Sequence, residues 1–152
     1  IPNSYDRFGS FEAPKYVSWS YGNRSQLIRI PAAKGEKVRM ELRSPDPAIN
    51  PYLAFALVIS AGFYGMENEL SLPDSVNVDL YTADNSITDN LMMLPENMEK
   101  ALKLAEKSEF IKSILGPEVL SRFIRLKTLE LQAFNQAIDK NEYYFNNYFK
   151  VI

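Results

Sequence analysis

A run of strand, turn, proline and helix signals in the first third of the chain most constrains its fold. Two short segments, residues 26–31 and 37–43, are typical of β-strands, and the turn Lys34-Gly35 lies between them. The sequence Ser44-Pro45-Asp46-Pro47 then ends the second strand, because proline has no amide hydrogen for a sheet ladder. Asn50-Pro51 follows as the N-cap and first residue of a helix. The stretch therefore predicts a β-hairpin that leads directly into a helix.

The second predicted strand alternates strictly, with Arg39, Glu41 and Arg43 on one face. If the hairpin closes at its turn, Arg29 lies near Arg39, and Arg24 lies near Arg43. Four guanidinium groups would then surround one carboxylate, and like charges that face each other across strands destabilise a sheet. A bound polyanion would stabilise such a patch, because arginine binds phosphate and carboxylate groups through paired hydrogen bonds. Glu41 in its middle is placed to hold a divalent cation between the oxygens of that anion.

The same residues allow a second interpretation. Glu41 could simply pair with Arg39 and Arg43 on a solvated strand face, where ion pairs are common and weak. Strand parity also argues against a single patch. Arg24 and Arg29 are five residues apart, so they point to opposite faces unless a bulge or the end of the strand intervenes.

Charge is distributed unevenly along the chain. Residues 1–50 hold eight Lys and Arg against five Asp and Glu, a net charge of +3, whereas the remainder carries a net charge of −5. The basic part coincides with the predicted strands, which favours a focused anion site over a nucleic-acid groove. A single-stranded nucleic-acid platform with Tyr16, Trp19 and Tyr21 is the alternative of another class, and the overall charge of −2 argues against it.

Composition limits the class further. The chain has 152 residues and no cysteine, so it is long enough for one domain with its own core and fits a reducing compartment. Its longest apolar run, residues 51–63, is too short to span a bilayer, and no signal peptide precedes it. We therefore expect a cytoplasmic protein that binds neither membrane nor nucleic acid.

The remainder of the chain is predicted to be mainly helical. The helix that begins at Pro51 should end near Gly62 or Gly65, and it is apolar nearly all round, which predicts that it is buried. Residues 66–94 have no clear period, and a loop of that length is usually functional or disordered. The expected fold class is α+β, an antiparallel sheet followed by several C-terminal helices. Further helices are expected at residues 95–107, 109–115 and 117–138, before an aromatic tail at residues 142–149.

These motifs, in this order, resemble the catalytic domain of glutamine synthetase, type I. Asn3-Ser4-Tyr5-Asp6-Arg7 resembles the family's Asn-Ser-Tyr-Lys-Arg segment, with Asp6 in place of the lysine, and Phe11-Glu12-Ala13-Pro14 resembles its Glu-Ala-Pro flap. The match covers about the first 65 residues and continues more loosely through the C-terminal helices. We therefore expect residues 1–152 to be the C-terminal part of that catalytic domain, part of its barrel. Residues 1–48 would hold the active-site strands and flap, and residues 49–152 would be mainly helical. The remaining matches are Asn23-Arg24-Ser25, Arg29-Ile30-Pro31, Arg39, Glu41, Arg43 and residues 44–52.

The resemblance implies ATP-dependent ligation of ammonia to glutamate through a γ-glutamyl phosphate. It implies that Glu12 and Arg24 are catalytic, with Glu12 on a flap that closes the site and helps to deprotonate ammonium. It further implies that Glu41 binds Mg²⁺ or Mn²⁺. By the same resemblance, Arg7 and Arg43 hold glutamate, whereas Arg24, Arg29 and Arg39 bind ATP.

The resemblance leaves several points open. A γ-glutamyl–amine ligase of the same superfamily would use the same phosphate and metal groups with an amine as acceptor. Asp79-Leu80-Tyr81 lies near the position of a tyrosine that is adenylylated in some family members, although its neighbours depart from the family pattern. Intact family members form dodecamers. Because the chain has no histidine and lacks most of the family's metal-binding glutamates, we expect it to be inactive by itself.

Overall fold

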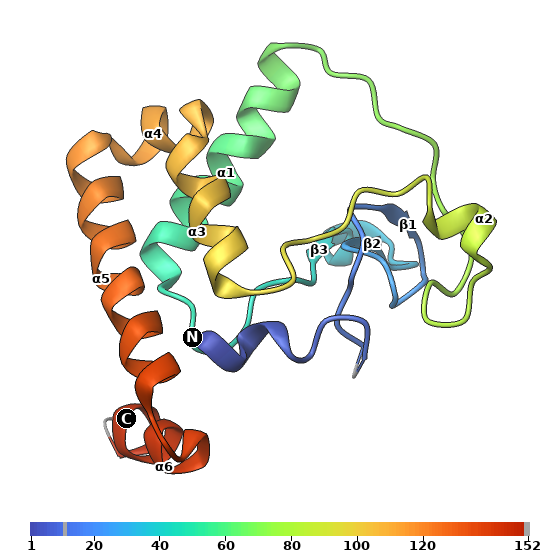
Figure 1. Ribbon diagram of the computed structural model, residues 1–152. Helices are drawn as coiled ribbons and strands as arrows, with labels where there is room; N and C mark the ends of the chain where they lie inside the picture. Colours follow the sequence, from blue (N-terminus) through green and yellow to red (C-terminus); the bar gives the residue numbers. More distant parts are fainter. Residues whose placement is uncertain (11, 151–152) are drawn as a thin grey trace. The chain divides into compact units, whose positions relative to one another are not determined.

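The computed structural model of the protein describes residues 1–10 and 12–150. It shows a small sheet and a set of helices, which confirms the α+β class (Figure 1). The chain divides into two compact units, residues 3–96 and residues 97–150. The first unit contains the sheet and also the first long helix, although the sequence patterns placed this helix in a mainly helical part, residues 49–152.

Three short strands form the sheet, in the order β1 (Trp19–Tyr21), β2 (Ile28–Ile30) and β3 (Glu41–Leu42). β2 and β3 are antiparallel, as expected, but β1 and β2 are parallel, so the sheet is mixed. Parallel neighbours require the chain to return to the start of the first strand. A three-residue strand is only about 10 Å long, so the short connection of residues 22–27 can make that return. A short 3₁₀ segment, η1 (Pro2–Tyr5), lies near the N-terminus.

The predicted hairpin between β2 and β3 is present, with a wider connection than expected. A 3₁₀ turn, η2 (Gly35–Lys37), follows Lys34, and Gly35 has a positive φ of 59° that favours glycine. The strands are shorter than predicted because residues 31–40 form the connection and leave the ladder.

The first long helix is α1 (Pro51–Glu67), and it begins as predicted: the Asn50 side chain accepts hydrogen bonds from the amides of Tyr52 and Leu53. It continues two residues beyond Gly65. The prediction that it is buried is wrong, because no residue of α1 is buried in the described chain, and Tyr52 and Phe55 are 85% and 65% exposed. No strand or helix among the described residues of the first unit packs extensively against it.

The segment after α1 returns to the sheet in an extended conformation (Figure 1, green to yellow). The Val76 amide donates to the Trp19 carbonyl oxygen at 2.9 Å, and the Leu94 amide donates to the Lys15 carbonyl oxygen at 2.8 Å. Its regular structure is limited to a single turn, α2 (Asn85–Thr88), and a bridge between Tyr16 and Met93. The prediction of a long irregular segment is confirmed, and the segment lies along residues 15–19 at the β1 edge of the sheet.

The second unit consists of helices joined by sharp caps. α3 (Met98–Lys107) and α4 (Glu109–Leu115) both pack on α5 (Pro117–Gln136), and Leu102 and Leu120 are buried. Gly116, with φ 75°, ends α4 and precedes Pro117, as the Gly-Pro signal predicts. The aromatic tail forms α6 (Lys140–Tyr144) and a π-helical turn, η3 (Phe145–Phe149).

Candidate active site

Glu41 on β3 is the centre of an arginine cluster. β2 pairs with β3 so that Arg29 lies directly opposite Glu41, and Arg29 Nη1 is 2.9 Å from Glu41 Oε2. Arg39 Nη2 donates to Oε1 of the same carboxylate at 2.8 Å, and Arg43 Nη1 is 3.5 Å from Oε2. Both carboxylate oxygens of Glu41 therefore face guanidinium groups.

Arg29 was expected to lie near Arg39, and the two guanidinium groups do contact the same carboxylate, Glu41. The residue directly across the ladder from Arg29 is Glu41, so an opposite charge lies between the like charges and reduces their repulsion. The parity argument against Arg24 also does not apply, because Arg24 lies in the turn before β2 and not on the strand.

A second carboxylate, Glu12, lies beside this cluster. Arg24 Nη1 is 2.9 Å from Glu12 Oε1, and Arg43 Nη2 is 3.9 Å from Glu12 Oε2. Arg43 therefore contacts both carboxylates and joins the two groups. The expected proximity of Arg24 and Arg43 is also present, since Arg43 Nε donates to the Arg24 carbonyl oxygen at 3.1 Å.

The charged side chains of the cluster differ in their exposure to solvent. The side chains of Arg29 and Arg43 are each 17% exposed, whereas those of Arg24 and Glu12 are 60% and 56% exposed. Hydrogen bonds from Arg29 and then Arg39 hold the pKa of the Glu41 carboxyl below its ordinary value. The hydrogen bond from Arg24 does the same for the pKa of Glu12. Four arginines face two ionised carboxylates, so the cluster has an excess positive charge that suits an anion.

Arg7 lies near this cluster without an ion pair to it among the described residues. Its Nη2 donates to the carbonyl oxygen of Ser44, the residue that follows Arg43, and its guanidinium lies over the Phe8 ring at 5.2 Å. The structure thus brings Glu12, Arg24, Arg29, Arg39, Glu41 and Arg43 together, with Arg7 at their edge. Phe11, beside Glu12 in the predicted flap, lies outside the described residues.

Buried polar residues around Arg24 hold the turn that carries it, and the sequence interpretation gave them no role. Gln26 is 0% exposed, and its Nε2 donates to the Val78 carbonyl oxygen at 3.0 Å. Asn23 Nδ2 donates to the same oxygen at 2.6 Å. The Ser25 hydroxyl, also buried, accepts from the Leu80 amide at 2.9 Å. The Asn-x-Ser pattern is typical of an Asx turn, and this signal could have identified the turn but not its distant partners.

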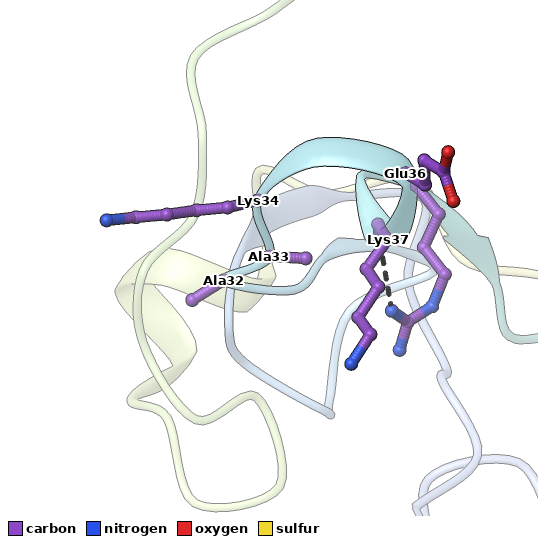
Figure 2. Close-up of a pocket in the computed structure, with 6 residues that line it drawn as sticks. Ala32, Ala33, Lys34, Glu36 and Lys37 are labelled. Atoms are coloured by element: carbon purple, nitrogen blue, oxygen red, sulfur yellow. Dashed lines mark hydrogen bonds between the residues drawn. The ribbon is translucent and has the colours of Figure 1, made fainter.

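A hollow of about 820 Å³ lies on the outer side of the β2–β3 connection. Lys34, Lys37 and Arg39 line it together with Glu36 and two alanines, so its charged groups are mainly positive. Figure 2 shows the side chains of Lys34 and Lys37 leaving the turn in different directions, with Ala33 between them. Arg39 Nη1 donates to the Lys37 carbonyl oxygen at 3.3 Å and so links the hollow to the Glu41 cluster.

The described residues contain neither a complete set of metal ligands nor a membrane-spanning helix. Within residues 1–10 and 12–150, no group of three or more His, Cys, Asp or Glu side chains is placed to hold a metal ion. Glu41 could therefore supply one metal ligand but not a complete set. No helix in the described part of the chain is long and apolar enough to cross a membrane.

The mixed sheet gathers arginines around two carboxylates, an arrangement that suits phosphate or carboxylate anions. Residues 1–146 match the family described as glutamine synthetase, catalytic domain, and the chain belongs to this family. The resemblance inferred from the sequence motifs is thereby confirmed.

Sequence similarity to two glutamine synthetases supports this assignment. Glutamine synthetase from Methanosarcina mazei is 39% identical over 141 residues, which cover 91% of this chain and 32% of that protein. Glutamine synthetase from Staphylococcus epidermidis is 37% identical over 153 aligned residues, which cover 97% of this chain and 34% of that protein. The chain therefore spans about a third of the length of the curated relatives it matches.

A solved structure also resembles the chain. It is described as a GmaS/ADP complex in its first conformation, with a TM-score of 0.73 and 26% sequence identity. The similarity covers 93% of this chain and 31% of the other.

Proposed function

We propose that a catalytic domain containing this chain ligates ammonia to glutamate at the expense of ATP. The observation that carries the proposal is the arginine cluster around Glu12 and Glu41 in a member of the glutamine synthetase family. In this reaction the glutamate side-chain carboxylate takes the γ-phosphoryl group of ATP, and ammonia then displaces phosphate. Both steps concentrate negative charge, so fixed cations contribute more than a protein nucleophile.

Each arginine has a proposed role in that chemistry. Arg24, Arg29 and Arg39 bind the ATP phosphates and stabilise the transferring phosphoryl group. Arg39 also lines the hollow beside the β2–β3 connection, and it is the residue of that hollow to which we give a role in ATP binding. The ADP named in the description of the similar solved structure supports a nucleotide as a ligand of the proposed enzyme.

Arg7 and Arg43 have the proposed role of binding the carboxylates of glutamate. Arg43 Nε and Nη2 hold the guanidinium against two backbone carbonyl oxygens, whereas Nη1 makes a 3.5 Å approach to Glu41 and can still donate to a substrate carboxylate. Arg7 donates to the carbonyl oxygen of Ser44, the residue after Arg43, so the two arginines lie close enough to be proposed for the same substrate.

The carboxylates have complementary proposed roles. Glu41 would supply one oxygen ligand to Mg²⁺ or Mn²⁺, and that metal ion would neutralise charge on the ATP phosphates. Its remaining ligands would come from parts of the catalytic domain outside this chain. Glu12 would accept a proton from ammonium when the flap closes, because a carboxylate beside ammonium both balances its charge and can take up its proton.

A ligation assay on a protein with the complete catalytic domain tests the proposal. ADP release should require ATP, glutamate, a divalent metal ion and ammonium, and methylamine or a polyamine in place of ammonium should give slower turnover. Faster turnover with an amine would instead identify a γ-glutamyl–amine ligase. The present chain by itself should be inactive, because a single carboxylate does not make a metal site. Clear turnover by the isolated chain would contradict the roles given above.

Assembly and modification are further parts of the proposal. The complete protein would be a homo-oligomer, a dodecamer as in the family, whereas this chain alone would be a monomer or a small oligomer by light scattering.

The Tyr81 side chain is 37% exposed, and adenylylation of its hydroxyl stays a prediction. Mass spectrometry of the protein after incubation with ATP and an adenylyltransferase would detect the added nucleotide.

A further inference from the structure

Two side chains connect the Glu12 loop to the turn that carries Arg24. Arg43 Nη2 donates to the Glu12 carbonyl oxygen at 2.9 Å, and Arg43 Nε donates to the Arg24 carbonyl oxygen at 3.1 Å. The Tyr81 hydroxyl lies 3.3 Å from the Ala13 carbonyl oxygen and 3.5 Å from that of Arg24. Arg43 and Tyr81 therefore bridge the same two backbone segments.

The backbone at Glu12 needs such support. Glu12 has a φ of 61°, in the left-handed region that residues other than glycine rarely adopt, and such a residue persists only where its surroundings hold it. The next residue, Ala13, is 2% exposed, and its carbonyl oxygen also accepts from the Gly9 amide at 3.0 Å. The Glu12 side chain is thus exposed, whereas the residue immediately after it is anchored.

Tyr81 is itself held by the turn on the other side of Arg24. The Val78 carbonyl oxygen accepts from Asn23 and Gln26, and the Leu80 amide donates to the Ser25 hydroxyl. The Tyr81 amide donates to the Asp79 carboxylate at 3.0 Å. Burial raises the pKa of the Tyr81 hydroxyl, with the Arg43 charge acting against this shift, so the hydroxyl is protonated and able to donate at neutral pH.

We propose that Tyr81 is a positioning residue whose hydroxyl ties the Ala13 carbonyl to the Arg24 turn and so keeps Glu12 in hydrogen-bonding distance of Arg24. A tyrosine hydroxyl has one hydrogen, so at any moment it donates to only one of the two carbonyl oxygens, that of Ala13 or that of Arg24. Because it lies between the two oxygens, it links the two backbone segments. The catalytic meaning of this tie rests on the roles proposed above for Glu12 and Arg24. The tie itself is independent of them.

The Tyr81→Phe variant of this chain removes the hydroxyl and keeps the ring. The first readout is the pKa of Glu12, from the ¹³C chemical shift of its carboxyl as pH is varied. Arg24 holds that pKa low through its hydrogen bond, with Arg43 and Arg29 adding to the effect. If Tyr81 fixes the Glu12–Arg24 geometry, the pKa of Glu12 rises toward its ordinary value in the variant. Tyr52→Phe, at a position 85% exposed on α1, is the matched control and should leave it unchanged.

Amide hydrogen exchange supplies the second readout. Loss of one hydrogen bond should speed exchange at the Ala13 amide about fivefold, since a net hydrogen bond contributes about 1 kcal/mol to local stability. The Leu80 amide, which donates to Ser25, should exchange at the wild-type rate. An unchanged pKa of Glu12 would overturn the proposal. Faster exchange at Leu80 as well as at Ala13 would also overturn it, because Tyr81 would then merely hold its own segment in place. A complete domain that fails to ligate ammonia would refute the proposed function without altering either readout.

Discussion

In the arginine site the partners of most contacts lie far apart in the sequence, whereas in the C-terminal unit many lie within one turn of a helix. Arg24 and Glu12 are 12 residues apart, and Tyr81 and Ala13 are 68 apart. On α3, by contrast, Lys103 pairs with Glu99 four residues away, and α5 has the same spacing between other partners. Local pairs support a helix before the chain has folded, but the site forms only when several distant segments meet.

The two regions also differ in how they use burial. In the C-terminal unit the buried side chains of α3 and α5 are apolar, as Leu102 and Leu120 illustrate. Around the site, buried positions include Ser25 and Gln26, whose polar atoms bind the 78–80 segment. Apolar contacts are tolerant of direction, whereas hydrogen bonds fix the direction of each group. A polar interior near Arg24 therefore suits a site that has to hold charged groups in set positions.

The largest expected effect is a difference in turnover between the Arg43→Ala and Lys34→Ala variants. In a protein with the complete catalytic domain, Arg43→Ala should lower turnover by about two to three orders of magnitude, the usual result of removing one charged donor worth about 3 kcal/mol in the transition state. Arg43 contacts both Glu12 and Glu41, whereas Lys34 lies in the turn. Lys34→Ala should hardly change turnover. Similar activities of the two variants in an ADP-release assay would contradict the assignment of the site.

The second prediction concerns the apolar interior of the C-terminal unit. Leu120→Ala removes a buried side chain of α5 and should lower the free energy of unfolding by about 3 kcal/mol, because it leaves a cavity. Urea denaturation followed by circular dichroism measures this change. Leu104→Ala, at a position 60% exposed on α3, should have a much smaller effect. A shift in the pKa of Glu12 in the folded Leu120→Ala variant would show that the two regions are coupled.

The third prediction concerns the aromatic tail. The Tyr148 hydroxyl donates to Glu130 Oε1 at 2.6 Å, and Lys127 Nζ lies 2.7 Å from Oε2 of the same carboxylate. Tyr148→Phe should lower the free energy of unfolding by about 1.5 kcal/mol, the usual size for a hydrogen bond to a charged group. Denaturant titration measures the loss, and Tyr21→Phe, at a position 65% exposed on β1, serves as the control. Equal stability of the two variants would show that this hydrogen bond of the tail does not stabilise the fold.

The smallest expected effect is a pH dependence of the same contact. Burial raises the pKa of the Glu130 carboxyl, but the hydrogen bonds from Lys127 and Tyr148 outweigh burial and hold it below its ordinary value of 4.5. A carboxyl with a lower pKa in the folded state stabilises the fold fully above its unfolded pKa. This contribution is lost as pH falls from about that value through the folded pKa. The difference in unfolding free energy between the wild type and Glu130→Gln should therefore shrink as pH falls below 4.5, and a difference independent of pH would contradict it.

Sequence alone determined the local features of this protein. The Asn50-Pro51 signal specified the start of α1, and Gly116-Pro117 specified the boundary between α4 and α5. These signals act within a few residues, because a cap or a proline affects only the adjoining backbone. The arginines and Glu41 were identifiable by their alternation and by the order of the family's motifs.

Only the tertiary structure decided how those residues meet. It set the register that places Glu41 opposite Arg29, paired β1 with β2 in parallel, and brought Tyr81 to Ala13. Strand register, sheet order and contacts across 68 residues depend on how the whole chain packs, and no local pattern encodes them. The exposure of α1 follows from the same cause: its composition predicts an apolar helix, but burial depends on which segments pack against it.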